Sequence, residues 1–497
     1  MTEYHVKQGA GGTGSTLPSL AAATKIARPG DIISLHEGIY REVPDLPAGI
    51  TLRAADGEKA IFDGGWDGKP MKGAKANGIL IKQPNITLQG LEIRNVRGRG
   101  VGLAQGDGFT MIGCYIHHTI NGGFGANGTG KLIRNVNIED CFMEHLSLSG
   151  RWQETPVNGC CLFRYVIGLR IKSLHIRYGH GEGFALGPFT QDAEVDGLLV
   201  EDTTHLGVYA SNRAINVLFR NCAVIQRGLD EWRQGDGDVG GGFIIGDEVA
   251  GDKTKKWPNG DKITIENCIT VNTTGVGVRN NVKLSDSGKL DGYDTRAEFV
   301  VQNCTFIAGP DSRSGIGIQE NQSGGRVKGV FRNNLFILDR LPAKADAVKN
   351  NAPGVTFQNN GWSIPVPAEV RGDGNIQIDA RAALVAPFAP LGETVDLSNY
   401  RARAGGAAAE RGWGALPAVP DGPEPPDPEP EPEPEPQPRH EEFVIVRNMP
   451  AGSSIVVRVV RPQDIHPVEG GAIDWEATKH SSMTLYFPTV EPAAVGE

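Results

Sequence analysis

A short phrase of alternating apolar and polar residues recurs along the chain. It reads Ile-Thr-Leu-Gln-Gly-Leu at 86–91, Val-Asn-Ile-Glu-Asp-Cys at 136–141, Ile-Thr-Ile-Glu-Asn-Cys at 263–268 and Phe-Val-Val-Gln-Asn-Cys at 299–304. Each copy has the period of two that is typical of a β-strand, and it ends on Asn, Asp or Gly before a small residue of buried type. Strands this short cannot each build a core, but stacked copies bury one continuous apolar column. The repeat therefore predicts a parallel β-solenoid.

Each repeat contains two further strands. A second strand follows the phrase, as at 335–338, and a glycine-led third strand comes next, as at 183–186, 242–245, 275–278 and 315–318. Asparagine tolerates the left-handed backbone angles that a tight bend after the first strand requires. The sequence lacks the helices of about 10 to 15 residues that a TIM barrel needs between its strands. We therefore expect an all-β chain, a right-handed parallel β-helix with three strands per rung.

The N-terminal part of this pattern resembles a known family. Residues 27–42, Ala-Arg-Pro-Gly-Asp-Ile-Ile-Ser-Leu-His-Glu-Gly-Ile-Tyr-Arg-Glu, follow a glycine-rich loop and precede Ile-Thr-Leu-Arg-Ala at 50–54. This stretch resembles the entry segment of pectate-lyase-like right-handed β-helix proteins, and the resemblance extends over residues 3–365. The superfamily includes polysaccharide lyases, glycoside hydrolases, epimerases and phage spikes. The resemblance implies this fold and a glycan ligand, but the activity must be argued from the site.

Composition divides the chain into five segments. Residues 1–30 form an N-terminal cap that contains one amphipathic helix at 15–28, with Ser15 or Thr16 as its N-cap and Pro29-Gly30 as its stop. Residues 31–365 form the β-helix, and 366–420, which lose the repeat, form a C-terminal cap. Nine prolines within 421–438 predict a polyproline rod on the order of 56 Å long. Residues 439–497 form a small β module for docking or assembly.

Charge and cysteine content restrict the ligands and the cellular compartment that we expect for the protein. The net charge of −10 arises largely from the acidic 421–438 segment, so the rest lacks the basic footprint of a nucleic-acid-binding protein. No apolar run is long enough to span a membrane. The start has no basic region followed by an apolar stretch, so we expect no signal peptide. Most of the seven cysteines follow the bend and have no metal-ligand spacing, which predicts buried free thiols and synthesis in the cytoplasm.

The outward side of the glycine-led strands and the loops after them are the expected binding groove. Aligning the rungs on Leu186, Ile245, Val278 and Ile318 places Asp247, Asn280 and Glu320 in one column. Asp247 and Glu320 are then roughly 9.6 Å apart, twice the strand spacing, near the separation used by inverting glycosidases. The alternative is that these groups only solvate the turns. The flanking residues predicted to bind substrate, with Arg279 orienting an acidic sugar, are Arg279, Asn280, Asn281 and Gln319.

A lyase needs a base and a group that neutralises the substrate. His180 and Glu182 lead into a groove strand within Leu-His-Ile-Arg-Tyr-Gly-His-Gly-Glu at 174–182, so a histidine base with a carboxylate partner is the second catalytic hypothesis. His175 and Arg177 alternate with apolar neighbours on a different strand. We interpret these two as surface residues.

The insertion at 228–262 supplies a third set of candidates. Trp232, Trp257, Asp236 and Asp238 are residue types that bind sugars through ring faces and carboxylates. Asp236-Gly-Asp238 resembles the start of a Ca²⁺ loop, but the remaining ligands of such a loop are missing. We therefore expect no metal site and no cofactor, with Ca²⁺ as the alternative.

Two functional readings follow. The first is a spike or fibre of a phage or phage-like particle that adsorbs to bacterial surface polysaccharide, with or without depolymerase activity. It implies a virion surface location, a protein partner or shell docked by the C-terminal module, and a homo-oligomer, a trimer by analogy with phage spikes. The alternative is a stand-alone polysaccharide lyase or inverting glycoside hydrolase that acts on acidic polysaccharide. Neither reading involves nucleic acid or a membrane span.

Overall fold

The computed structural model describes residues 1–8, 14–71, 76–128, 131–152, 159–211, 214–232, 239–248, 260–283, 296–318, 326–392, 394–416, 443–445, 454–460 and 480–486. Only the backbone is described at 152, 247–248, 260–261, 280–283, 296 and 326, and in the last three ranges. The chain divides into two compact units, Met1–Pro420 and Asp421–Glu497.

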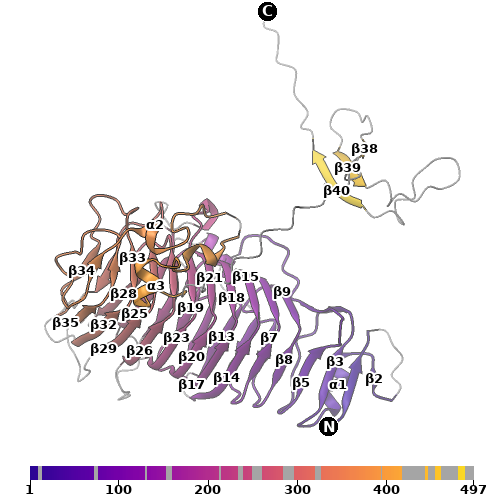
Figure 1. The fold of residues 1–497 in the computed structure, drawn as a ribbon. Helices are drawn as coiled ribbons and strands as arrows, with labels where there is room; N and C mark the ends of the chain where they lie inside the picture. The colour runs from indigo at the N-terminus through magenta and orange to yellow at the C-terminus, as the bar shows by residue number, and fades with distance from the viewer. Residues whose placement is uncertain are drawn as a thin grey trace, which may run out of the picture. The chain divides into compact units, whose positions relative to one another are not determined.

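The first unit is a right-handed parallel β-helix, as the repeat predicts. Three long parallel sheets run along it, and from β7 onward the chain contributes one short strand to each sheet in turn (Figure 1). The expected architecture of three strands per rung is therefore confirmed. We call the sheets first, second and third in the order in which the chain visits them within a rung.

The first sheet contains the recurring phrase, and it has 14 strands within the described residues. In sheet order these are β2 (Thr16–Leu17), β1 (Glu3–Val6), β3 (Ile32–Leu35), β5 (Thr51–Ala54), β8 (Thr87–Gln89), β11 (Thr110–Ile112), β14 (Ile133–Glu139), β17 (Val166–Lys172), β20 (Gln191–Asp196), β23 (Ile215–Arg220), β26 (Gly260–Glu266), β29 (Arg296–Gln302), β32 (Arg326–Arg332) and β35 (Gly354–Gln358).

The second sheet has 13 described strands. From the N-terminal end these are β4 (Gly38–Tyr40), β6 (Ala60–Asp63), β9 (Glu92–Val96), β12 (Tyr115–Thr119), β15 (Phe142–Leu146), β18 (His175–Gly179), β21 (Leu199–Thr203), β24 (Ala223–Ile225), β27 (Ile269–Val271), β30 (Thr305–Ile307), β33 (Leu335–Ile337), β36 (Gly361–Trp362) and β37 (Ile376–Gln377).

The third sheet has 10 described strands, many of them led by glycine. They are β7 (Ile79–Ile81), β10 (Val101–Leu103), β13 (Phe124–Asn127), β16 (Cys161–Arg164), β19 (Phe184–Leu186), β22 (Leu206–Ala210), β25 (Gly241–Glu248), β28 (Val278–Lys283), β31 (Ile316–Ile318) and β34 (Val348–Asn350).

The bend between the first and second sheets is the reason for the Asn, Asp or Gly at the end of each phrase. Asn221, Asn267, Asn303 and Asn333 take φ values of 54°, 53°, 52° and 56° there. This left-handed conformation is one that few residues other than Gly and Asn adopt at low cost. The residue after the bend then points into the core. Five of the seven cysteines occupy that place, and all seven are free and buried.

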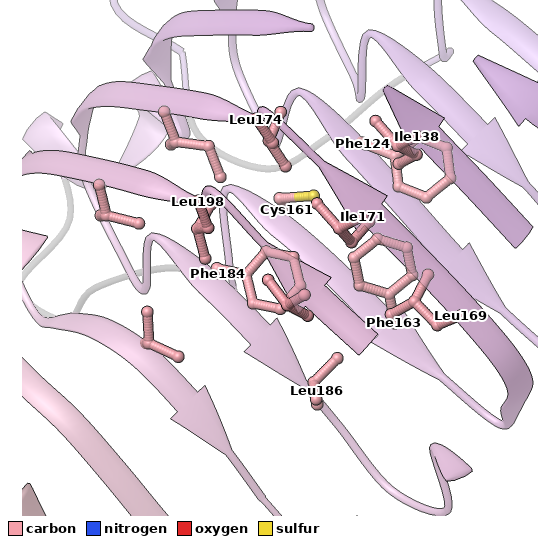
Figure 2. Close-up of a cluster of buried hydrophobic side chains, with 14 of the residues drawn as sticks. Phe124, Ile138, Cys161, Phe163, Leu169, Ile171, Leu174, Phe184, Leu186 and Leu198 are labelled. Atoms are coloured by element: carbon pink, nitrogen blue, oxygen red, sulfur yellow. The ribbon is translucent and has the colours of Figure 1, made fainter. Parts of the chain in front are cut away.

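The core is a column of apolar side chains enclosed by the three sheets. Figure 2 shows part of it, where Phe124, Phe163 and Phe184 from the third sheet stack along the helix axis. Their ring centroids are 5.3 Å and 5.4 Å apart. Alternate residues of the first sheet, such as Ile138 and Ile171, close the column from another side. Burial of such a column stabilises a solenoid because each rung covers its neighbour.

The N-terminal helix is shorter than the sequence predicts. It is α1 (Leu20–Ile26), and its N-cap is Ser19, whose hydroxyl accepts a hydrogen bond from the Ala22 amide at 3.2 Å. Thr16, one of the predicted N-caps, pairs with His5 in the first sheet instead. Pro18 separates that strand from the helix. Leu20 and Ala23 are fully buried at this end of the core.

The residues after 365 continue the second sheet briefly and then turn back along its outer face. The helical segments are α2 (Ala380–Ala383), η3 (Leu397–Tyr400) and α3 (Ala407–Arg411). They form a second apolar cluster with outward residues of the second sheet, including Ile225 and Ile337. The Ala415 amide donates to Thr305 Oγ1 at 3.0 Å. Residues 380–416 therefore cover a sheet face, and the end-cap role predicted for 366–420 stays a prediction.

The second unit contains a three-stranded antiparallel sheet, in the order β38 (Phe443–Ile445), β39 (Ser454–Val460) and β40 (His480–Tyr486). The alternating apolar residues of the sequence predict strands here at 443–447, 455–461 and 483–487. The proposed proline rod at 421–438 lies outside the described residues. Within the part of the chain that the structure describes, no helix has the length and apolar character needed to cross a membrane.

Candidate functional site

The outer face of the third sheet carries a row of hydrogen-bond donors. At five places a side chain from one rung lies against a glycine of the next rung. These donors, which we call the donor ladder, are Asn77, Arg99, Arg164, Tyr209 and Arg279, and the glycines beneath them are Gly102, Gly125, Gly187, Gly246 and Gly317. The ladder extends from β7 to β31, eight strand spacings or roughly 38 Å. A row of this length is suited to an extended ligand.

The glycines exist in these strands because the side chains above them need the space. A Cβ on Gly125 would lie 2.6 Å from both Cδ and Nε of Arg99. A Cβ on Gly102 would lie 2.3 Å from Asn77 Nδ2. Neither glycine has a left-handed φ, so the requirement at these positions is space and not backbone freedom. Glycine at these positions thus makes room for the side chains that lie on the outer face of the sheet.

Three members of the ladder are arginines without a carboxylate partner. In the described part of the chain, Arg99, Arg164 and Arg279 form no ion pair. Some arginines of the other two sheets are paired, since Arg177 donates to Glu144 at 2.7 Å in the second sheet and Arg220 bonds Asp196 at 2.8 Å in the first. Arginines that are paired within the fold have their charge neutralised, whereas unpaired ones on one face can bind an anion.

The two ends of the ladder differ from its centre. In the centre, Leu162, Ala185, Tyr209 and Ile244 form a small buried apolar cluster on the outward side of the sheet. At the C-terminal end, Arg279 is exposed. At the N-terminal end, Asn77 lines a cavity of about 410 Å³ together with Arg41, Asp63 and Arg97. A cavity of this size is in the range of small-ligand sites.

The register of the third sheet corrects one predicted column. Asp247 pairs with Val282, and Asn280 pairs with Ile245, so Asp247 and Asn280 do not share a column. The prediction aligned Val278 with Ile245, but Val278 pairs with Phe243. The reason is Gly277, which takes a φ of 85° and accepts a hydrogen bond from the Phe243 amide, so Gly275 and Val276 precede the strand as extra residues.

The remaining groove candidates are placed only in part. Arg279 lies on β28, beside Ile244 and Gly317, and not in one column with Gly246 as the same alignment predicted. Asn281 pairs with Gly246, and only its backbone is described, as for Asp247 and Asn280. Four predicted carboxylate and amide side chains and one tryptophan lie outside the described residues, namely Glu320, Gln319, Asp236, Asp238 and Trp257. Their predicted roles stay predictions.

His180 is buried, which does not favour the proposed role of a base. It is 5% exposed, and its Nε2 has no hydrogen-bond partner among the described residues. Burial, followed by the nearby charge of Arg151, lowers the pKa of His180 to about 3. The ring is therefore neutral and a weak base. Glu182 lies two residues further on and is half-buried, but His180 Nε2 is not paired with it.

Trp232 is also unavailable to a sugar. It belongs to η2 (Asp230–Trp232), is 3% exposed, and packs on His180 with ring centroids 4.3 Å apart. Tyr178 stacks on the same indole at 5.1 Å. The segment is held to η1 (Leu148–Trp152) by an ion pair of 2.7 Å between Arg151 and Glu231. The rings of His180 and Tyr178 thus cover the indole of Trp232, which the sequence predicted to bind a sugar.

Sequence reasoning missed Asn77, Arg99, Arg164 and Tyr209. A signal was present, because several third strands carry glycine at an outward position as well as at their start. An outward glycine in a strand marks a close approach by another group. Among the described residues, no three His, Cys, Asp or Glu side chains are arranged to hold a metal ion. The Ca²⁺ alternative at Asp236 and Asp238 is outside those residues.

The protein is thus a right-handed parallel β-helix with a donor-lined outer sheet face. Residues 77–247 match the family model described as a right handed beta helix region. At the level of fold, the resemblance to pectate-lyase-like β-helices is confirmed. No curated protein sequence shows a significant match to the chain.

Several solved structures have a similar fold. The structure of XylC with xylose shares 10% identity and a TM-score of 0.47, covering 97% of this chain and 95% of that one. A rhamnogalacturonan lyase shares 16% identity and a TM-score of 0.45, covering 84% and 100%. A polygalacturonase from Erwinia carotovora ssp. carotovora shares 11% identity and a TM-score of 0.39, covering 75% and 96%. At these identities the likeness describes fold, and each named activity belongs to the compared protein.

Proposed function

We propose that the protein binds an extended bacterial surface polysaccharide along the donor ladder, as a spike or fibre of a phage or phage-like particle. The observation that carries the binding proposal is the set of unpaired arginines on one face of one sheet. Each lies on glycine backbone, which fixes its side chain against a flat surface. Donors held in place before binding lose less entropy when a ligand arrives.

The spike assignment has separate support. A solenoid of stacked rungs is a stiff rod, because every rung contacts only its neighbours and the core is continuous. Seven buried free thiols fit a protein that is made and assembled in a reducing compartment. In this proposal the second unit docks to a protein partner or shell, the assembly is a homo-oligomer, and the virion surface is the site of action.

Binding is tested with purified protein and a panel of capsular and other surface polysaccharides. We expect one or more polymers to bind wild-type protein, and Arg279→Gln to weaken that binding at least about threefold. Arg332→Gln is the matched control, because Arg332 lies on the first sheet, where it donates to Gln302 at 2.6 Å. Absence of binding to every polymer, or equal loss in both variants, would contradict the proposal.

The same samples test the competing reading of a lyase or glycoside hydrolase. Release of reducing ends or unsaturated uronides would reveal cleavage of a bound polymer. Turnover that is lost in Asp247→Asn or Glu320→Gln, with binding retained, would favour the enzyme. Binding without turnover would favour a spike that only adsorbs.

A further inference from the structure

We infer that the cavity near the N-terminal end of the β-helix binds a small apolar acid, a molecule with an aromatic or aliphatic body and one carboxylate group. The cavity has a volume of about 410 Å³, which is in the range of small-ligand sites. In this inference Arg41 and Arg97 bind the carboxylate, and an apolar wall that includes Val43 and Phe62 contacts the body. The inference goes beyond the proposed function and does not depend on glycan binding.

The cavity exists because the third sheet begins later than the other two. Among the described residues its first strand is β7, although the first and second sheets already have strands in two earlier rungs. The segment 41–49, after β4, contains Pro44 and Pro47, and the segment 64–71, after β6, contains three glycines and Pro70. Proline cannot donate to a strand ladder, and glycine weakens a strand. These segments therefore form loops, and the cavity lies between them and the residues before β7.

Two arginines from different rungs meet at one residue of the wall, Gly65. Arg97 follows β9, and its Nη2 donates to the Gly65 carbonyl oxygen at 3.3 Å. Arg41 follows β4, and its Nη1 lies 3.6 Å from the place that a Cβ on Gly65 would take. Gly65 has a φ of 68°, a left-handed conformation that favours glycine. This turn therefore brings the two guanidinium groups to the same part of the cavity.

The two acids of the wall leave these arginines available to a ligand. Asp63 pairs with Arg94 at 3.2 Å, whereas its distance to Arg41 is longer, 3.6 Å. Glu42 accepts a hydrogen bond from the first turn of α1 at 3.0 Å. Arg41 makes no hydrogen bond and Arg97 no ion pair within the described residues. Their guanidinium groups therefore retain donors, and a planar fork of this kind suits a carboxylate.

The rest of the wall is largely apolar. The rings of Tyr40 and Phe62 have centroids 5.8 Å apart, and the Tyr40 hydroxyl donates to the His36 carbonyl oxygen at 2.7 Å, so its polar group is already used. Val43 also lines the cavity, and at 61% it is more exposed than any other large apolar side chain of the described residues except Met1. An exposed apolar side chain beside available arginines suits a ligand that is both apolar and anionic.

This combination favours an apolar acid over a sugar or a simple anion. A sugar ring presents hydroxyl groups that the apolar wall cannot bind by hydrogen bonds. A simple anion would leave the same wall in contact with water. An aromatic or aliphatic acid uses both parts of the cavity, because burial of its apolar surface adds to the charge-assisted hydrogen bonds of its carboxylate.

Isothermal titration of the full chain tests the inference. The probes are the sodium salts of phenylacetate, cinnamate and octanoate, each compared with its neutral amide, together with sodium acetate and sodium galacturonate. Arg41→Gln and Arg97→Gln each remove one guanidinium, and Arg332→Gln on the first sheet is their control. Val43→Ser removes apolar surface from the wall, and its control is Val385→Ser, which changes an exposed valine that does not line the cavity.

We expect at least one of the three apolar acids to bind wild-type protein, Arg332→Gln and Val385→Ser alike. Its binding should be at least about fivefold weaker in Arg41→Gln and in Arg97→Gln, and about threefold weaker in Val43→Ser. The amide of that acid, acetate and galacturonate should each bind wild-type protein at least about tenfold more weakly than the acid. Circular dichroism should show the same fold in every variant, because the substituted side chains are exposed.

Every other result would overturn the inference. If no apolar acid binds at concentrations up to about 10 mM, or if an acid and its amide bind equally, the cavity is not a site for apolar carboxylates. If acetate binds as tightly as the apolar acids, the arginines form a simple anion site, and if galacturonate does, the cavity belongs to the glycan surface. Equal affinity in wild-type protein and the three cavity variants would place the bound acid elsewhere.

Discussion

Three ring side chains lie next to the last residue of their second-sheet strands, at positions with a left-handed backbone where Asn or Gly would cost less. His118, His145 and Tyr178 take φ values of 53°, 51° and 56° on successive rungs. The centroids of His118 and His145 are 4.7 Å apart, and those of His145 and Tyr178 are 5.0 Å apart. Stacking between rungs offsets the cost of the left-handed conformation. Trp232 then covers this column of rings, so His118 and His145 have a structural role.

The burial of His180 under Trp232 predicts a loss of stability in acid. The pKa of His180 is lowered to about 3 in the folded chain, against a usual value near 6.5 when unfolded. The unfolded state therefore binds the extra proton between these values. The stabilising contribution is complete above pH 6.5 and declines as pH falls toward 3, at about 1.4 kcal/mol per pH unit. His118, whose pKa is lowered to about 4, acts in the same direction.

The variant His180→Phe isolates this contribution. Phenylalanine keeps the ring against Trp232 and removes the nitrogen that has no partner, so stability at pH 7 should change by less than about 1.5 kcal/mol. Urea unfolding between pH 7 and pH 4 should show a flatter dependence for the variant than for wild type. Parallel curves for the two proteins would mean that His180 is hydrated or paired in solution.

At the scale of elements, one sheet face changes character along its length. The outward column of the second sheet is charged or polar from β9 to β21 and apolar from β24 to β33. It reads Arg94, His117, Glu144, Arg177 and Glu201, and then Ile225, Val271, Ile307 and Ile337. The change coincides with the cover formed by residues 380–416. The cover therefore explains why outward residues of later rungs are not polar.

Trp413 holds this cover in place. It is 1% exposed and lies on Gly361 of the sheet, where a Cβ would be 2.8 Å from its Cζ3 atom. We expect Trp413→Ala to reduce the free energy of unfolding by roughly 3–5 kcal/mol and to make 380–416 sensitive to protease. Urea unfolding and limited proteolysis measure both effects.

Two variants control for this change. Trp413→Phe should cost less than the alanine variant, because the indole N–H has no hydrogen-bond partner in the part of the chain that the structure describes and only ring volume is lost. Arg411→Ala removes the guanidinium that lies 5.0 Å from the indole ring and should cost about 1 kcal/mol or less. If the alanine variant were as stable and protease-resistant as wild type, the cover would not be packed in solution.

Secondary-structure elements could be predicted from the sequence where a local residue pattern specifies them. Features that depend on contacts between rungs could not. Alternation and the Asn bend specify the strands of the first sheet, so the β-helix follows from the sequence. The register of β28 could not be predicted, because Gly275 and Gly277 both resemble the glycine that leads a third strand. Arg99 was missed because its role depends on a side chain that crosses to Gly125 on the next rung. The cover at 380–416 was missed because it carries no repeat.

At the scale of the whole molecule, the β-helix and the C-terminal sheet are separate structures. Each of the four described sheets lies within one unit. The C-terminal rungs of the solenoid also have a dense aromatic core of their own. Phe336 stacks on Trp362 at 4.1 Å, and Phe331 stacks on Phe357 at 4.7 Å. The β-helix therefore has the sheets and core that an independently folding unit needs.

A chain that ends at Pro420 should fold and bind glycan like the full-length protein. All described rung interfaces remain, and the stability of a solenoid is a sum over rungs and their neighbouring interfaces. We expect the melting temperature to change by less than about 2 °C, which for a protein of this size is a small part of the free energy of unfolding. Circular dichroism and the polysaccharide titration measure these quantities. A chain that ends at 365 is the contrasting control, since it loses the cover over Ile225 and Ile337 and should melt at lower temperature. If the 420-residue chain bound glycan more weakly, the second unit would belong to the binding surface, and its assignment to docking would be wrong.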